Sequence, residues 1–265
     1  MEKINGVVIL GAGNVATHLG KALSDAGIRV LQVYSRRLSS ARTLAGNLGC
    51  PATSNIHDLL PGAGLYLMAV TDDAISGLAA GFPLPGSLLV HTSGTTGMSE
   101  LLQGSSRAGV FYPLQTFSRE VDVDLSNVPI CLEAENEQDL MLLGQTASRL
   151  SKHVVHVPSP KRKRLHVAAV FACNFVNHMY HVAEQLMQEE DLDFELLRPL
   201  IMETALKVMT AAPHQVQTGP ASRNNTRVLE AHNRLLAGRP GYRKLYNLLS
   251  QSIIGACHEP GNQKS

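Results

Sequence analysis

The sequence predicts an α/β Rossmann domain with a mostly parallel sheet, followed by an all-α C-terminal domain. A glycine-rich turn at residues 11–16 separates an apolar run from a helix-length segment. Short apolar runs then alternate with helix-length segments to about residue 157, which is typical of a parallel sheet with covering helices. After Pro158, apolar residues recur at three- and four-residue spacing, which indicates helices. We therefore expect two domains, residues 1–158 and 159–265.

Seven strands are expected in the first domain, because seven short runs are rich in Val, Ile and Leu and are bounded by Gly, Pro, Asn or Ser. These runs are Val7–Leu10, Val30–Tyr34, Leu65–Val70, Leu88–His91, Gly109–Tyr112, Val128–Leu132 and His153–Val157. In the second domain the periodicity predicts helices at Lys161–Glu190, Phe194–Ala212, Arg227–Ala237 and Tyr242–Gly255.

Composition narrows the class of function. Apolar residues make up 44% of the chain and charged residues 17%, which is ordinary for a globular protein. The formal charge of +1 gives no broad basic surface for a nucleic acid backbone. No apolar run is long enough to span a membrane, and no signal peptide is evident. The four cysteines are scattered without a C-x-x-C pair, so we expect a cytoplasmic protein with a small-molecule substrate and no metal.

The glycine-rich turn has the form G-x-G-x-x-A. Gly11 should permit a tight turn, and Gly13 should let the backbone approach a pyrophosphate. Ala16 is small enough for close packing of helix against strand. Asn14 and Val15 begin the helix, whose N-terminus should face the anion. This arrangement after a strand and before a helix predicts a dinucleotide site.

The end of the second expected strand predicts which dinucleotide binds. Ser35, Arg36 and Arg37 stand where an NAD enzyme usually has an Asp or Glu for the ribose hydroxyls. Guanidinium and hydroxyl groups instead suit a ribose 2′-phosphate. We therefore predict NADP as the cofactor, with the alternative that one or both arginines, Arg37 in particular, are solvated loop residues.

Two further strand ends should lie at the same edge of the sheet. Val70, Thr71, Asp72 and Ile75 join a buried strand to the next helix, and we expect them beside the cofactor. The carboxylate of Asp72 also suits a helix cap.

His91, Thr92 and Ser93 end the following strand, where nicotinamide and substrate should meet. We expect Thr92 to contact the cofactor and His91 and Ser93 to contact the substrate. Simple turn chemistry is the alternative for all three.

The motifs together resemble Rossmann-like NADP oxidoreductases that are described as deazaflavin-dependent and carry a helical C-terminal domain of unknown function. The residues that carry this resemblance are Gly11–Ala16, His91–Gly94, Phe111–Phe117, His166–Asn174 and Thr218–Asn224. The group is similar to the lineage of 3-hydroxyisobutyrate dehydrogenase, 6-phosphogluconate dehydrogenase and pyrroline-carboxylate reductase. That resemblance implies an oxidoreductase whose helical domain, like that of 6-phosphogluconate dehydrogenase, closes over the nicotinamide and often forms the dimer.

The resemblance also implies residue roles. In the hydroxyacid dehydrogenases of that lineage, an interdomain helix carries G-x-x-x-K-x-x-x-N, and the corresponding positions here are His166, Val170 and Asn174. Asn174 fits the substrate-orienting position, whereas Val170 replaces the lysine and cannot donate a proton. Ser93 corresponds to a substrate-binding serine. Substrate contacts are also expected from Tyr112, Pro113, Gln115 and His166.

The same expected helix carries histidines that could donate a proton in place of the missing lysine. His166, Val170, Asn174 and His178 recur every four residues and should share a helix face, with His166 about 12 Å from Asn174 at about 1.5 Å per residue. Within about two turns of the same helix, a polar stripe is expected from Asn174, Asn177, His178 and His181. A histidine there could supply a proton near neutral pH. We therefore assign Asn174 to substrate orientation and His178 to proton donation, with Ser93 as the third catalytic residue. The alternative is a hydrogen-bonded interdomain helix with no catalytic member.

The expected function is thus transfer of a hydride between NADP and a small carbonyl, imine or hydroxy compound, in either direction. A non-catalytic NADP sensor or scaffold is the alternative, which the missing lysine favours. The basic run at residues 161–164 is expected to be a solvated helix entry or to reach the NADP phosphates. The apolar circumference of Phe194–Ala212 predicts a homodimer through the helical domain.

Overall fold

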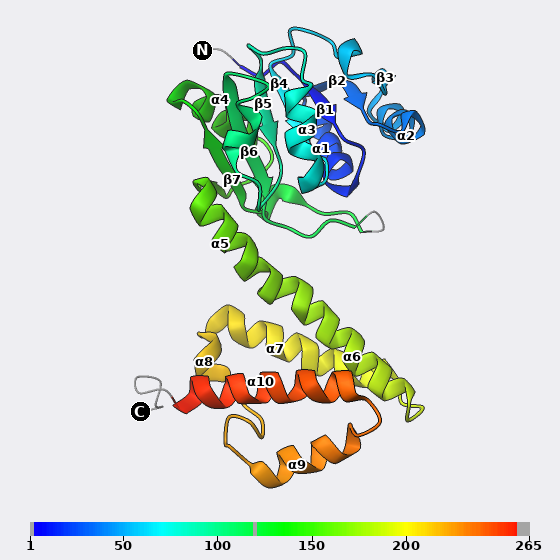
Figure 1. Cartoon of the computed structure of the whole chain (residues 1–265), viewed down its shortest axis with the longest axis vertical. Coiled ribbons are helices and arrows are strands. Elements are labelled where there is room, and N and C mark those ends of the chain that lie inside the picture. The colour runs from blue at the N-terminus through cyan, green and yellow to red at the C-terminus, as the bar shows by residue number, and fades with distance from the viewer. Residues whose placement is uncertain (1–2, 119–120, 259–265) are drawn as a thin grey trace. The chain divides into compact units, whose positions relative to one another are not determined.

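The computed structural model describes residues 3–118 and 121–258. Its contacts divide the chain into two compact units, residues 1–174 and 175–265 (Figure 1). The first unit includes the helix that follows the sheet, so this division lies later in the chain than the change from strands to helices after Pro158. The two units are described separately below.

The first unit is built on one sheet, which has eight strands in the described residues, in the order β3-β2-β1-β4-β5-β6-β7-β8. The strands are β1 (Gly6–Leu10), β2 (Arg29–Tyr34), β3 (Ala52–Thr53), β4 (Leu65–Met68), β5 (Leu88–His91), β6 (Arg107–Pro113), β7 (Ile130–Ala134) and β8 (Val154–His156). All neighbours pair in parallel except β6 and β7, which are antiparallel. The predicted Rossmann-like fold with a mostly parallel sheet is therefore confirmed.

The strand order reverses at β1, because the chain runs outward to β2 on one side and later to β4 on the other. Such a switch point leaves a crevice at the carboxyl ends of the strands, where dinucleotides bind. The seven expected strands are present, with differences of a few residues at their ends. The short edge strand β3 was not predicted, because two residues give no periodic signal.

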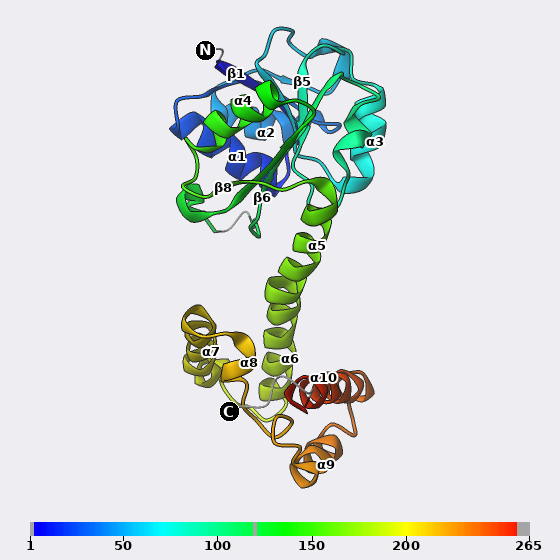
Figure 2. The ribbon, with the colours of Figure 1, turned by 90° about the vertical axis from the view of Figure 1, so that its left-hand side faces the viewer.

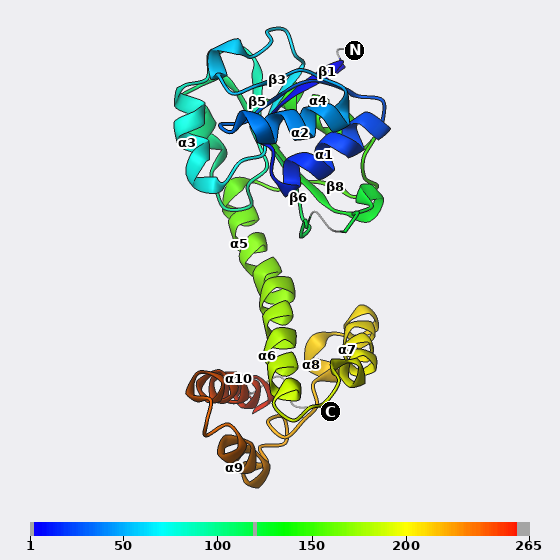
Figure 3. The ribbon, with the colours of Figure 1, turned by 90° about the vertical axis from the view of Figure 1, so that its right-hand side faces the viewer.

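Helices cover both faces of the sheet. The helices α1 (Asn14–Asp25), α2 (Leu38–Leu48) and α4 (Glu137–Ala147) bury Leu19, Leu44 and Leu143 against one face. On the other face, α3 (Asp72–Ala80) buries Ile75 and Ala79. Figures 2 and 3, seen from opposite sides, show α1 and α2 on one side of the sheet and α3 on the other. Fully buried Val and Leu side chains in β1 and β4 explain the continuous apolar runs of the sequence.

The helix expected at Lys161–Glu190 is present but is not a regular α-helix. It begins as α5 (Ser159–Ala169), continues as a π-helical segment at Val170–Phe175 and then becomes α6 (Val176–Gln188). Hydrogen bonds in a π-helix span five residues, not four. The regular α-helix expected through His166, Val170, Asn174 and His178 is therefore interrupted by a π-helical segment.

The second unit is helical, as predicted. It comprises α6, α7 (Arg198–Thr210), α8 (Pro213–Val216), α9 (Thr226–Leu235) and α10 (Pro240–His258), with a 3₁₀ turn at Phe194–Leu197 before α7. Hydrogen bonds from His232 to Tyr246 and between Asn233 and Asn247 join α9 to α10. An ion pair between Arg239 and Glu189 joins the start of α10 to the end of α6.

Large apolar side chains remain exposed on this unit. Leu200, Met202, Leu206 and Met209 of α7 are all more than half exposed, and Met209 reaches 80%. A helix that is apolar around its circumference is normally covered by protein.

No helix among the described residues combines the length and the apolar character that crossing a membrane requires.

Candidate functional site

The turn after β1 requires glycine at its first position. Gly11 has a φ of +128°, a conformation that L side chains rarely adopt. A Cβ added there would lie 2.1 Å from the carbonyl oxygen of Ala69. The Gly11 amide also donates a hydrogen bond of 2.8 Å to the Tyr34 carbonyl. Gly11 thus lets the turn pass between the ends of β2 and β4, as the sequence predicts.

Gly13 stands at the start of α1 and faces open space. A Cβ added at Gly13 would meet no atom within 4 Å, and no side chain caps the helix N-terminus. The first amides of a helix have no partner within the helix, and they carry the positive end of its dipole. These residues therefore fit a phosphate or pyrophosphate group against the N-terminus of α1.

A pocket of about 790 Å³ extends from this turn along the carboxyl edge of the sheet. The residues that line it are Gly11, Ala12, Gly13, Asn14, Val15, Tyr34, Ser35, Arg36, Ser40, Ala69, Val70, Thr71, Ala74, Gly77, Leu78, Gln115 and Phe117. They come from the ends of β1, β2, β4 and β6 and from α1, α2 and α3. The pocket is thus the crevice expected at the switch point.

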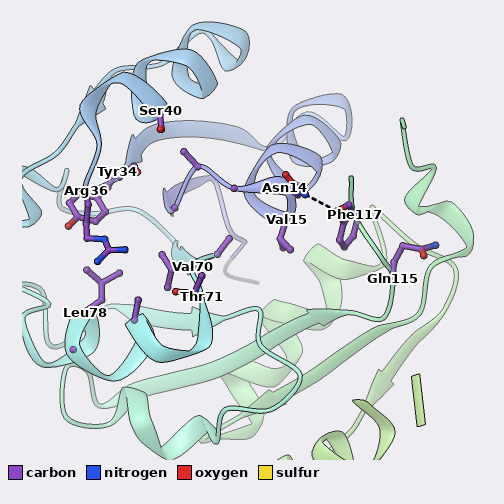
Figure 4. Close-up of a pocket in the computed structure, with 17 residues that line it drawn as sticks. Asn14, Val15, Tyr34, Arg36, Ser40, Val70, Thr71, Leu78, Gln115 and Phe117 are labelled. Carbon is purple, nitrogen blue, oxygen red and sulfur yellow. Dashed lines mark hydrogen bonds between the residues drawn. The ribbon is translucent and has the colours of Figure 1, made fainter. Parts of the chain in front are cut away.

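Figure 4 shows Arg36 and Leu78 at one end of this pocket, and Gln115 and Phe117 at the other. Arg36 is exposed and makes no ion pair within the described residues. Ser35 and Ser40 add hydroxyl groups to the same lining. An unpaired guanidinium with two hydroxyls fits a phosphate on the adenosine ribose.

The other end of the pocket is fixed to α1 by the segment after β6. The side-chain amide of Asn14 donates a hydrogen bond of 2.8 Å to the carbonyl oxygen of Phe117. His18 contacts the Ser118 carbonyl at 2.7 Å through Nε2, and its ring lies 5.1 Å from that of Phe117. Asn14 and His18 thus hold the segment bearing Gln115 and Phe117 against the helix that begins at the phosphate site.

Four residues expected at the cofactor do not line this pocket. Arg37 is exposed and precedes α2, and Asp72 begins α3 and accepts a hydrogen bond from Thr95. Ile75 is fully buried in the core, and Thr92 is buried and bonds the Met68 carbonyl at 3.4 Å. Arg37, Asp72 and Ile75 each follow a lining residue directly in sequence, whereas Thr92 follows a neighbouring strand, β5, that contributes no residue to the lining.

The pocket lining also includes residues that the sequence did not predict to bind the cofactor, among them Tyr34, Ser40, Leu78 and Phe117. The signal available for Ser40 was its position early in α2, the helix that follows β2. Leu78 stands near the end of α3, and its sequence position gave no such signal.

A second pocket, of about 390 Å³, lies beside the first and shares Gln115 with it. Its walls come from the end of β6 and the segment after it, and from α5 and the π-helical segment. Its lining residues are Tyr112, Leu114, Gln115, Thr116, Leu165, His166, Ala168, Ala169, Val170, Ala172, Cys173 and Asn174. Tyr112, Gln115, His166 and Asn174, four residues predicted to bind or orient substrate, are therefore in one pocket.

Tyr112 and His166 form a hydrogen-bonded pair in this wall. Tyr112 Oη lies 3.0 Å from His166 Nδ1. Burial, reinforced by the neighbouring Cys131, raises the pKa of Tyr112 to about 12, although Arg162 opposes this rise. The phenol therefore keeps its proton at neutral pH.

The pair is packed against Gly94. A Cβ added at Gly94 would lie 2.4 Å from His166 Nδ1 and 2.9 Å from Tyr112 Cζ. Glycine at this position thus leaves the room that the two rings occupy.

His91 and Ser93 line neither pocket. His91 is fully buried, and its Nδ1 accepts a hydrogen bond of 3.1 Å from the Ser93 amide. Burial, with the nearby charge of Arg162, lowers the pKa of His91 to about 4. Ser93 Oγ accepts hydrogen bonds from the amides of Thr95 and Thr96 and donates one to Thr96 Oγ1. Both side chains therefore organise the turn after β5.

The basic run at residues 161–164 corrects a sequence expectation. Arg162 is fully buried and pairs with Glu133, and it also donates to the carbonyl oxygens of Ser93 and Thr96. The expectation that the whole run is solvated is thus wrong for Arg162. Its guanidinium ties the first turn of α5 to the turn after β5 and to β7, a role that a run of like charges does not reveal.

His178, the predicted proton donor, lies on α6 in the second unit, and its ring centroid is 6.3 Å from that of His181. Within residues 3–118 and 121–258, no three His, Cys, Asp or Glu side chains converge as ligands for a metal ion.

Comparison with known proteins identifies the two halves of the chain. A Rossmann-like domain matches residues 3–116, and a domain of unknown function, DUF2520, matches residues 128–253. A protein from Bacteroides fragilis, assigned as an NADP oxidoreductase, shares 42% identity and a TM-score of 0.89, covering 94% of this chain and 98% of its own. The chain belongs to the Rossmann-like family with a DUF2520 domain. The resemblance stated from the sequence is therefore confirmed.

More distant structures share the fold of this DUF2520 protein. A reductive aminase from Aspergillus terreus, in complex with NADPH and ethyl-5-oxohexanoate, has 14% identity and a TM-score of 0.74, covering 99% of this chain and 97% of its own. The 1-pyrroline-5-carboxylate reductase of Streptococcus pyogenes has 11% identity and a TM-score of 0.63, covering 95% and 98%. Among curated proteins, no relative matches the chain.

Proposed function

We propose that the protein is an NADP-dependent oxidoreductase that transfers a hydride to or from a small carbonyl, imine or hydroxy compound. The observation that carries this proposal is the pocket at the switch point, with an open helix N-terminus at Gly13 and an unpaired guanidinium at Arg36. When bound, NADPH supplies the hydride. The structural neighbours are NADP oxidoreductases, which supports the same chemistry.

Different residues of the first pocket would bind different parts of the dinucleotide. The amides of α1 would hold the pyrophosphate, since the residue at Gly13 leaves the approach open. Arg36, with Ser35 and Ser40, would hold the 2′-phosphate. Val70 and Thr71 line the middle of the pocket, and Gln115 belongs to both pockets, so the nicotinamide end would face the second pocket.

The second pocket would hold the substrate. Asn174 lines it, which supports the proposed role in substrate orientation. Ser93 and His178 remain proposals as substrate-binding and proton-donating residues. The reaction direction, and the use of a deazaflavin coenzyme implied by the family resemblance, are parts of the proposal that kinetics would decide.

A homodimer through the helical unit is also proposed. The exposed side chains of Leu200, Met202, Leu206 and Met209 support it, because so much apolar surface on one helix is normally buried. A cytoplasmic location is proposed from the scattered reduced cysteines.

The alternative function is NADP sensing without catalysis. It is favoured by Val170, an apolar residue of the second pocket where the resembling dehydrogenases have a lysine. Titration with NADPH and NADH, followed by NADPH oxidation with ketones, imines and oxo acids, separates the two proposals. Binding of NADPH with turnover of any of these supports an oxidoreductase, binding without turnover supports the sensor, and failure to bind either dinucleotide overturns both.

A further inference from the structure

The second pocket has a composition that selects against charged substrates. Among the described residues, its lining contains no Lys, Arg, Asp or Glu side chain. Leu114, Leu165 and Val170, with three alanines, make up half of its described lining residues. The buried cation Arg162 of α5 is already paired with Glu133 and with backbone carbonyls. A carboxylate or phosphate in the pocket would therefore meet no Lys or Arg side chain among the described lining residues.

The same pocket offers one pair of groups that can pass a proton. Tyr112 Oη and His166 Nδ1 are 3.0 Å apart, and both residues belong to the lining. Their rings are 6.1 Å apart at an interplanar angle of 60°. Both rings pack directly against the Gly94 backbone, where an added Cβ would collide with each of them. The phenol is therefore held at the wall of the pocket that adjoins the dinucleotide pocket through Gln115.

We propose that Tyr112 is the proton donor of the reaction, that His166 resupplies its proton, and that the substrate in this pocket is an uncharged carbonyl or imine compound. This inference rests on the proposed oxidoreductase function. It assigns proton donation to Tyr112 and His166 of the first unit in place of His178.

The proton steps balance as follows. The substrate carbon accepts the hydride, the C=O or C=N π bond breaks, and its electron pair remains on oxygen or nitrogen. The O–H bond of Tyr112 then breaks and its proton goes to that atom, giving an alcohol or amine. The protonated His166 imidazole gives its Nδ1 proton to the phenolate and regains one from water. Besides burial, Cys131 of β7 and Asp72 of α3 raise the pKa of Tyr112, and Arg162 of α5 lowers it.

The kinetic test compares two tyrosines that have the same kind of partner. Tyr246 Oη lies 2.8 Å from His232 Nδ1 on the helical unit, and Tyr246 lines neither the dinucleotide pocket nor the second pocket. Tyr112→Phe should lower kcat for cyclohexanone or 2-methyl-1-pyrroline by about 10²- to 10⁴-fold, the usual contribution of general acid catalysis, with little change in KM. Tyr246→Phe should leave kcat unchanged.

A second measurement needs no turnover. The His166 imidazole resonances, assigned by NMR with a His166→Gln variant, should shift when cyclohexanone is added to the NADP⁺-saturated protein. The same concentration of 2-oxobutanoate, a carboxylate of similar size, should leave them unmoved.

The outcomes distinguish this inference from the proposed function. Loss of NADPH binding by the native protein contradicts the oxidoreductase proposal itself. If NADPH binds and is oxidised but Tyr112→Phe keeps kcat within threefold, or if His178→Ala alone abolishes turnover, the proton-donor assignment is wrong. If 2-oxobutanoate perturbs His166 and cyclohexanone does not, the uncharged substrate class is wrong.

Discussion

Reversal of the charge at Arg36 tests the cofactor proposal most directly. Arg36 lines the dinucleotide pocket and has no ion-pair partner in the described part of the chain, so its guanidinium is available to a 2′-phosphate. A hydrogen bond to a charged group contributes about 1.5 to 3 kcal/mol. Arg36→Gln should therefore weaken NADPH binding by roughly 10- to 150-fold at about 1.4 kcal/mol per tenfold change.

Arg36→Glu should weaken NADPH further, because it adds repulsion between the carboxylate and the phosphate. NADH has no 2′-phosphate, so its affinity should change by less than the affinity for NADPH in both variants. Fluorescence titration of both nucleotides at two salt concentrations measures the difference, and the NADPH effect should shrink as salt rises.

The neighbouring Arg37 provides the matched control. It is also exposed but does not line the pocket, so Arg37→Gln should leave the preference for NADPH unchanged. Equal affinity of the native protein for NADPH and NADH would refute the reasoning. An equal effect of the Arg36 and Arg37 variants would show that general charge, not a specific phosphate contact, sets the preference.

Three further predictions concern packing, assembly and pH. Gly94→Ala should destabilise the fold by about 1 to 3 kcal/mol, because the added Cβ would lie 2.4 Å from a His166 ring atom. Urea denaturation should show no such loss of stability for the control Gly46→Ala, where an added Cβ meets no atom within 4 Å. Light scattering should report a dimer that Met209→Glu dissociates, and a native monomer at high concentration would contradict this. Burial lowers the pKa of His91 from 6.5 to about 4, so on acidification the unfolded chain takes up a proton at a higher pH than the folded chain does. Neutral His91 should therefore contribute about 3 kcal/mol to the free energy of unfolding above pH 6.5, and this contribution should be lost as the pH falls toward 4. Urea denaturation of native protein and His91→Gln over this range checks it, and identical pH dependence of the two would contradict it.

The fold could be predicted because it depends on local patterns. Apolar strands bounded by turn residues and the G-x-G-x-x-A turn each give a signal within a few residues. The position of Gly11 could be predicted for the same reason, since a strand followed by a helix requires a turn there. By contrast, β3 is too short to give any pattern, and the antiparallel pairing of β6 with β7 depends on contacts distant in sequence.

The candidate site was predictable only in part, because side-chain direction is not a local property. Arg36 and Arg37 are adjacent in sequence, but only Arg36 lines the pocket. Arg162 belongs to a run of four basic residues, yet it is buried because Glu133 and two carbonyl oxygens lie opposite it. The π-helical segment is a further example, since its hydrogen bonds change the residue spacing within a stretch whose apolar periodicity predicts an ordinary α-helix.

Val170 stands where the resembling dehydrogenases have a lysine, and it lines the same pocket as Tyr112. In the resembling dehydrogenases a lysine at this position handles the proton, and here an apolar side chain lines the pocket instead. A lysine there would find no carboxylate partner among the described residues of the lining. Tyr112 meets the same need without adding a charge, since burial keeps its phenol protonated and His166 lies 3.0 Å away to restore the proton. An apolar residue at 170 and a phenol at 112 are therefore consistent parts of one pocket for uncharged substrates. Val170→Lys should accordingly weaken cyclohexanone binding and leave the NADPH affinity unchanged, and tighter cyclohexanone binding would contradict this account.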